Sequence, residues 1–235
     1  MRQGTSPIIQ IMGQRTVPWW LRYIPSRIQF LDDFEGILKW YEYSPTVTKD
    51  NSFQVFEGNY CLKLATAATA GSEARARLFL GAIQNSKIMF QFRWHYLSAL
   101  QTNPRSFYLK ATIYDGSYMT VLGLQHLLNL TTPQNKWQYW SDSNAWTDLP
   151  GGSQVIAAVQ KGHQYLMLKA DLSVSPPKYI MAELNNLVID MSTLRPYRVA
   201  SSENARILID LGVITDAAAE TDAYVDAFCF SDQEP

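Results

Sequence analysis

Residues 87–97, which read KIMFQFRWHYL, decide the fold class of this chain. Large apolar side chains stand at every second position from residue 88 onward, and side chains of mixed polarity stand between them. Successive side chains of a β-strand point to opposite faces, so this spacing predicts a long strand with one face in a core. The opposite face, which carries Gln91, Arg93 and His95, is predicted to meet water or a ligand.

Residues 106–114 repeat this alternation, with apolar side chains on one face of a second predicted strand. The polar and aromatic side chains of its other face are Tyr108, Lys110 and Tyr114. We expect these side chains to share one sheet face with Gln91, Arg93 and His95, with Trp140 nearby. Such a face has two interpretations. It can bind a glycan, with aromatic rings stacked on sugar rings, or it can be buried by a neighbouring subunit.

Turn residues separate the predicted strands. The pair Asp115-Gly116 is a hairpin signal, and it predicts a partner strand at 118–124. Further strands are expected at 137–141, 165–171, 178–183, 186–190, 205–211 and 223–230. Only residues 152–160 and 216–221 have a spacing that suits short helices. Many short strands with frequent turns are typical of a sandwich or barrel.

The composition supports one large β domain and excludes several functions. The chain has 235 residues, of which 47% are hydrophobic and 13% aromatic, whereas only 17% are charged, against about 25% in ordinary globular chains. Many aromatic and few charged residues favour extensive sheet and surface that is buried against something else. A net charge of -1 gives no electrostatic basis for binding nucleic acid.

We expect neither a membrane segment nor a signal peptide from the sequence. No apolar run reaches the 18 residues that a spanning helix needs, so no membrane partner is expected. The apolar residues at 8–12 are too few for a signal peptide, and Gln10 interrupts them.

Residues 1–27 are expected to form an extended arm that precedes a sandwich at residues 28–235. Prolines and a glycine interrupt every regular element of the arm. Its most apolar side chains are Trp19, Trp20, Tyr23 and Ile24. These side chains are too apolar for a free tail, so the arm packs on its own domain or on a neighbouring subunit. We favour the neighbouring subunit, which makes this segment an assembly arm.

Five short motifs follow one another along the chain. They are DDFEG at 32–36 with Trp40, FEGNYCLKL at 56–64, KWQY at 136–139 with Trp146, LKADL at 168–172 with Tyr179, and AYVDAF at 223–228. In this order they resemble the concanavalin-like and laminin-G-like jelly rolls of carbohydrate-binding modules and phage structural proteins. The resemblance covers residues 28–231. It implies an all-β, two-sheet antiparallel sandwich.

The resemblance makes sugar hydrolysis a function to consider, and the residues of this chain disfavour it. Related glucanases present the acids of an E-x-D-x-x-E motif on one strand, and a retaining mechanism needs two carboxyl groups about 5–5.5 Å apart. The nearest match is Glu220 and Asp222 with Asp226, where the last acid comes one position late. A shift of one residue turns a strand side chain to the other face. The three histidines form no zinc pattern, so we expect no enzyme.

The resemblance also implies a metal. Jelly rolls of this kind often hold a structural calcium ion between their first and last strands, and Asp33, Glu35 and Asp226 match those places. The alternative is an acidic turn with exposed carboxylates, and no other cofactor is expected. Cys61 and Cys229 lie in strands that can come close together, so they form either a disulfide or two buried thiols.

Two functions follow from these observations. The favoured hypothesis is a non-enzymatic structural or interaction protein, such as a capsid, decoration or tail component, which is located in the virion and associates with itself or with other virion proteins. The alternative is an extracellular carbohydrate-binding module or lectin. A glycoside hydrolase or lyase comes third.

Overall fold

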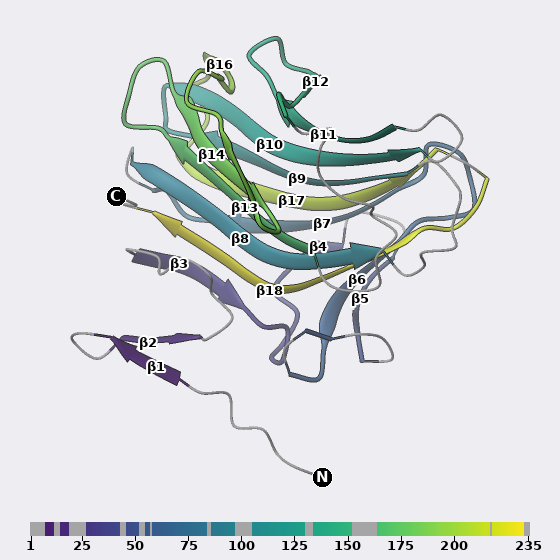
Figure 1. The fold of residues 1–235 in the computed structure, drawn as a ribbon. Helices are drawn as coiled ribbons and strands as arrows, with labels where there is room; N and C mark the ends of the chain where they lie inside the picture. Colours follow the sequence, from purple (N-terminus) through teal and green to yellow (C-terminus); the bar gives the residue numbers. More distant parts are fainter. Residues whose placement is uncertain are drawn as a thin grey trace.

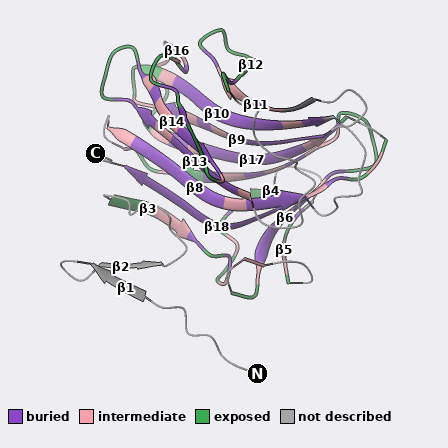
Figure 2. Ribbon diagram, in the orientation of Figure 1, coloured by how far each residue is buried: buried purple, intermediate pink, exposed green. Residues whose placement is uncertain are grey.

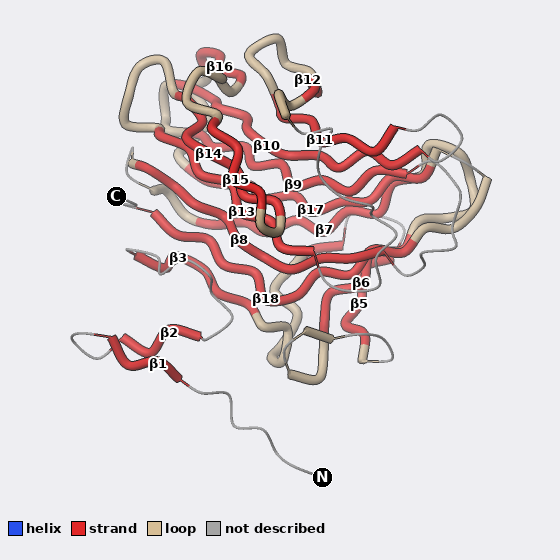
Figure 3. Tube along the Cα trace, viewed as in Figure 1, coloured by secondary structure: helices blue, strands red, loops and turns tan. Residues whose placement is uncertain are grey.

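A computed structural model describes residues 8–11, 15–18, 27–42, 46–51, 55–56, 58–83, 86–96, 105–129, 134–151, 164–216 and 218–232. These residues form strands and turns but no helix (Figure 3). Within them, therefore, no helix is long and apolar enough to cross a membrane. The apolar residues of the predicted arm (Trp19, Trp20, Tyr23 and Ile24) and the helix predicted at 152–160 lie outside the described residues.

Two antiparallel sheets of eight strands pack face to face (Figure 1). The β9 sheet has the order β12 (Trp146–Asp148), β11 (Gln134–Trp140), β10 (Tyr118–Asn129), β9 (Arg105–Tyr114), β17 (Arg206–Thr215), β7 (Glu73–Leu80) and β4 (Tyr41–Glu42), and β16 (Tyr197–Ala200) also pairs with β10. The β8 sheet has the order β15 (Leu187–Asp190), β14 (Lys178–Leu184), β13 (Gln164–Asp171), β8 (Lys87–Tyr96), β18 (Asp222–Asp232), β6 (Cys61–Ala65) and β5 (Thr46–Asp50), and β3 (Arg27–Asp32) also pairs with β18. A separate hairpin joins β1 (Ile8–Ile11) and β2 (Arg15–Pro18). The predicted two-sheet sandwich is confirmed.

The core lies between the two sheets, and the long central strands are buried along most of their length (Figure 2). Aromatic side chains connect the sheets. Trp94 on β8 stacks on Phe107 on β9, with ring centroids 4.4 Å apart and planes within 5°. The alternation in the sequence therefore predicted the inward faces of both strands correctly.

The hairpin predicted at Asp115-Gly116 joins β9 to β10. The backbone N–H of Asp115 donates to the carbonyl of Tyr118 (3.1 Å), and Gly116 has a φ of 91°. The Asp115 carboxylate also accepts hydrogen bonds from the N–H groups of Ser117 and Tyr118. A residue with positive φ and a side chain that caps the turn are what a tight two-residue hairpin requires.

The helix predicted at 216–221 is wrong, because none of the described residues of this segment is helical. Its backbone groups pair elsewhere. The N–H of Thr221 donates to the Thr66 hydroxyl (2.9 Å), and the carbonyl of Thr221 accepts from the N–H of Thr66 (3.0 Å). The Thr215 hydroxyl donates to the carbonyl of Ala219 (3.0 Å). These bonds hold the segment as a connection into β18, so its short apolar pattern is not a helix face.

Cys61 and Cys229 are buried thiols and form no disulfide. Burial, together with the nearby Asp226 and Asp50 carboxylates, raises the pKa of the Cys61 thiol to about 12. Since the thiolate is the reactive form, we expect both cysteines of the folded protein to resist a thiol reagent at pH 8. A colorimetric disulfide reagent should detect two thiols only after guanidinium is added. Rapid labelling of either cysteine in the native protein would contradict this packing.

Candidate functional site

The side chains predicted to form one ligand face lie on two different sheets. β8 and β9 follow one another in the sequence, but β8 lies between β13 and β18, whereas β9 lies between β10 and β17. Gln91, Arg93 and His95 are therefore on the outer face of the β8 sheet. Tyr108, Lys110, Tyr114 and Trp140 are on the outer face of the β9 sheet. The expectation of a single shared face is wrong, because the chain changes sheets between Tyr96 and Arg105.

On the β8 sheet, the three predicted side chains are occupied by contacts within the chain. The Arg93 guanidinium lies 4.7 Å from the Phe56 ring centroid and 4.6 Å from that of Tyr165. The Gln91 side-chain carbonyl accepts a hydrogen bond from the Tyr165 hydroxyl (3.0 Å). His95 stacks on Tyr224 at 5.0 Å. Gln91 and His95 are buried, so this set offers little surface to a ligand.

The outer face of the β9 sheet carries a row of aromatic and charged side chains that crosses seven strands. In strand order it comprises Trp146, Trp140, Gly123, Lys110, Asp210, Arg77 and Tyr41. Gln138, Gln125, Tyr108, Gly212 and Arg75 form the neighbouring row. We call these two rows, together with Glu73 at the start of β7, the β9 face. Tyr114 lies further along β9, where the Arg206 guanidinium is 4.9 Å from its ring.

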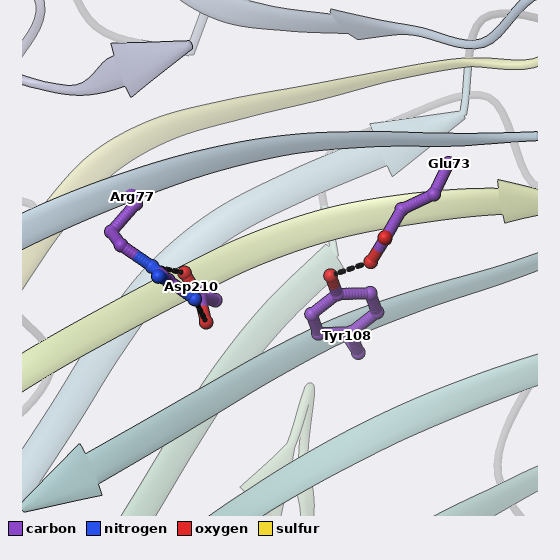
Figure 4. Close-up of polar contacts among 4 residues, drawn as sticks. All are labelled: Glu73, Arg77, Tyr108 and Asp210. Atoms are coloured by element: carbon purple, nitrogen blue, oxygen red, sulfur yellow. Dashed lines mark hydrogen bonds and ion pairs between the residues drawn. The ribbon is translucent and has the colours of Figure 1, made fainter. Parts of the chain in front are cut away.

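Both carboxylates at the centre of the β9 face are engaged by neighbours (Figure 4). Arg77 donates two hydrogen bonds to Asp210, from Nε to Oδ1 at 2.6 Å and from Nη2 to Oδ2 at 2.8 Å. Glu73 accepts a hydrogen bond from the Tyr108 hydroxyl. Burial and the Glu73 carboxylate raise the pKa of Tyr108, so its hydroxyl stays protonated and keeps donating. The bidentate pair fixes the charged centre of the face.

Two tryptophans stand at one end of the row. Trp140 and Trp146 meet edge to face, with ring centroids 5.0 Å apart and planes at 89°. The Lys110 ammonium lies 3.5 Å from the centroid of the Trp140 ring, close enough for a cation–π contact. Both tryptophans are half-buried and keep part of their surface toward solvent.

Gly212 and Gly123 have no side chains, so the rings of Tyr108 and Trp146 can lie directly on the sheet. A Cβ atom on Gly212 would be 2.3 Å from the Tyr108 ring. A Cβ atom on Gly123 would be 2.5 Å from the backbone oxygen of Leu109 and 3.1 Å from the Trp146 ring. Any side chain at these two positions would therefore displace an aromatic ring of the face.

Two buried polar atoms of the β9 face have no hydrogen-bond partner within the part of the chain that the structure describes. They are the indole Nε1 of Trp140 and the side-chain oxygen Oε1 of Gln125. Gln125 is only 7% exposed and lies opposite Tyr108 in the register of β9 and β10. Unpaired buried groups are costly, and both of these atoms are covered by the protein itself.

Comparison with known proteins shows the fold. No family model and no curated protein matches the sequence. Among solved structures, a protein of unknown function with a galectin-like fold from Bacillus subtilis matches with a TM-score of 0.53. The alignment has 9% identity and covers 89% of this chain and 98% of that one. The fold is a concanavalin-like jelly roll.

Two further structures match this jelly roll more weakly. An alginate lyase from Chlorella virus has a TM-score of 0.48 and 9% identity, and the alignment covers 83% of this chain and 93% of the lyase. A CBM22 xylan-binding domain from Paenibacillus barcinonensis has a TM-score of 0.42 and 12% identity, with 88% and 96% covered.

The acidic residues considered for hydrolysis do not converge in the jelly roll. Glu220 is exposed, Asp222 forms an ion pair with Lys63 (3.1 Å), and Asp226 is fully buried. The Asp226 carboxylate accepts hydrogen bonds from the N–H groups of Phe56 (2.8 Å) and Ala227 (2.7 Å). Since one acid is buried and another is paired, they do not form the two facing carboxylates that a retaining glycosidase needs.

The carboxylates predicted to hold calcium are likewise engaged by backbone amides. Glu35 Oε1 accepts from the N–H groups of Asn59 (2.6 Å) and Tyr60 (2.9 Å), and Asp33 accepts from the N–H of Glu35 (3.2 Å). The described residues contain no group of three or more His, Cys, Asp or Glu side chains that could hold a metal ion. Asp33, Glu35 and Asp226 therefore do not fit a shared calcium ion.

Sequence reasoning missed several members of the β9 face, namely Glu73, Arg75, Arg77, Gln125, Gln138, Trp146 and Asp210. A signal for β7 was present in residues 73–77, which read EARAR and place a charged side chain at every second position. The small Ala74 and Ala76 between them are buried in the core. The alternation of alanine with charged residues at every second position therefore indicated a strand with one polar face.

Proposed function

We propose that this jelly roll binds carbohydrate and that the β9 face holds the glycan. The observation that carries the proposal is the Trp140–Trp146 pair, which stands beside a row of charged and amide side chains on one sheet face. Aromatic rings pack on the apolar faces of sugar rings, and polar side chains bind the hydroxyl groups.

This proposal gives first place to the carbohydrate-binding alternative. The hypothesis of a virion component rested mainly on the arm at residues 1–27, whose apolar side chains lie outside the described residues. None of the structural matches reported above supports a virion component. The carbohydrate-binding hypothesis is supported by a face whose contacts are described.

We expect Trp140→Ala and Trp146→Ala each to weaken glycan binding about 30-fold, since a tryptophan that anchors an interface contributes on the order of 2 kcal/mol or more. The measurement is a glycan array with the wild-type protein, followed by calorimetric titration of the bound glycan with each variant. Val188→Ala is the control, because Val188 is exposed on β15 at the edge of the other sheet. Unchanged affinity in both tryptophan variants would contradict the assignment of this face.

A further inference from the structure

We infer that the glycan bound by the β9 face is anionic and that Lys110 binds its carboxylate or sulfate group. The inference rests on the proposed function, since it names the class of glycan that the same face would take. Two features carry it: the charges of the face and the surroundings of Lys110.

The charges of the face do not balance. On the outer face of β7, β9, β10, β11, β12 and β17 the register places five cations and three carboxylates, namely Arg75, Arg77, Lys110, Lys136 and Arg206 against Glu73, Asp148 and Asp210. Asp210 directs both of its oxygens to Arg77, and Glu73 accepts from the Tyr108 hydroxyl. The excess positive charge of this face suits an anionic partner.

Lys110 has no carboxylate partner among the described residues. Lys110 lies opposite Asp210 in the register of β9 and β17, yet no ion pair of the described residues includes it. Its ammonium nitrogen lies 3.5 Å from the centroid of the Trp140 ring. Burial lowers the pKa of Lys110, and the Asp210 carboxylate offsets part of this effect. A half-buried ammonium without an anion has a desolvation cost that a bound carboxylate or sulfate would offset.

A neutral sugar leaves the Lys110 ammonium without an anion, whereas a sugar acid or a sulfated sugar supplies one. The surroundings of Lys110 therefore favour the charged ligand.

The test compares acidic with neutral polysaccharides on the full-length protein. The probes are polygalacturonate, alginate and chondroitin sulfate, with xylan, dextran and methyl-esterified polygalacturonate as uncharged polymers. We expect at least one acidic polymer to bind about 10-fold more tightly than the uncharged ones, since hydrogen bonds between charged groups are among the stronger contacts of a binding site. The esterified polymer removes the charge without any change in the protein. Comparison of the uronates with the sulfated polymer tells which anion is preferred.

Variants then assign the effect to Lys110. We expect Lys110→Gln to lower affinity for the acidic polymer about 10-fold and Lys110→Arg to retain most of it. Lys136→Gln is the matched control, since Lys136 lies on the same sheet but is paired with Asp148 at 2.8 Å. Tighter binding of an uncharged polymer, or Lys110→Gln without effect on the acidic one, would overturn the inference and leave the proposed function standing. Failure to bind any glycan would overturn both.

Discussion

Trp94→Ala is expected to lower the free energy of unfolding by about 3–5 kcal/mol, the range for removing a large aromatic side chain from a packed core. Trp94 is 1% exposed and belongs to the β8 sheet, while its partners belong to the β9 sheet. It stacks on Phe107 at 4.4 Å and meets Trp137 edge to face at 5.9 Å. Alanine would leave a cavity between the sheets, where close packing limits how far the neighbours can move.

Urea denaturation followed by circular dichroism measures this loss. Phe79→Ala is the control, because Phe79 is 49% exposed on the outer face of β7 and its loss should cost about 1 kcal/mol or less. Trp94→Phe should fall between the two, since a smaller ring keeps part of the stack on Phe107. Equal stabilities of Trp94→Ala and Phe79→Ala would show that these aromatic contacts do not join the sheets.

Asp210→Asn is expected to cost about 3 kcal/mol, since breaking a buried ion pair from one side is strongly destabilising. The Asp210 side chain is 6% exposed, and it accepts two charge-assisted hydrogen bonds from Arg77. The amide that replaces the carboxylate has one acceptor oxygen, so it cannot accept both bonds of the fork. Asp210 and Arg77 join neighbouring strands of the β9 sheet, and the loss should therefore appear in the stability of the whole domain.

The matched comparison is Asp148→Asn. Asp148 also pairs with a cation, Lys136, but its side chain is 63% exposed, and exposed pairs contribute about 0–1 kcal/mol. Thermal unfolding of the two variants at low and high salt distinguishes the buried ion pair from the exposed one. We expect salt to change the effect at Asp148 more than the effect at Asp210, because buried charges are screened less. A loss at Asp210 no larger than that at Asp148 would mean that the Arg77 pair contributes little.

The inward faces of the long strands were predictable from the sequence because alternation is a property of the strand itself. The apolar side chains of residues 88–96 and 107–113 are buried as their spacing indicates. Strand pairing was not predictable in this way. β8 pairs with β13 and β18, which lie far along the sequence, and no local pattern encodes that choice. The predicted ligand face was divided between two sheets for this reason.

The low strand propensity of some residues also kept part of the candidate site from being predicted. β7 combines alanine with charged residues, which are uncommon in strands, so only its alternation marked it as one. Asp210 belongs to a strand whose start was predicted, but its role depends on Arg77, a partner on a strand that was not among the predicted ones. A pair that joins two strands becomes visible only once the strand order is known.

The place of β18 within the β8 sheet has a consequence for how the chain folds. Residues 222–232 are hydrogen-bonded to β3, β6 and β8, which all occur within the first 96 residues. Pairings between distant segments make folding slow, because the loop-closure entropy is lost before the contacts form. During translation, β6 and β8 remain without their shared partner until residues 222–232 have been synthesised. A chain interrupted before residue 222 would carry bare strand edges, the kind of surface on which other chains aggregate.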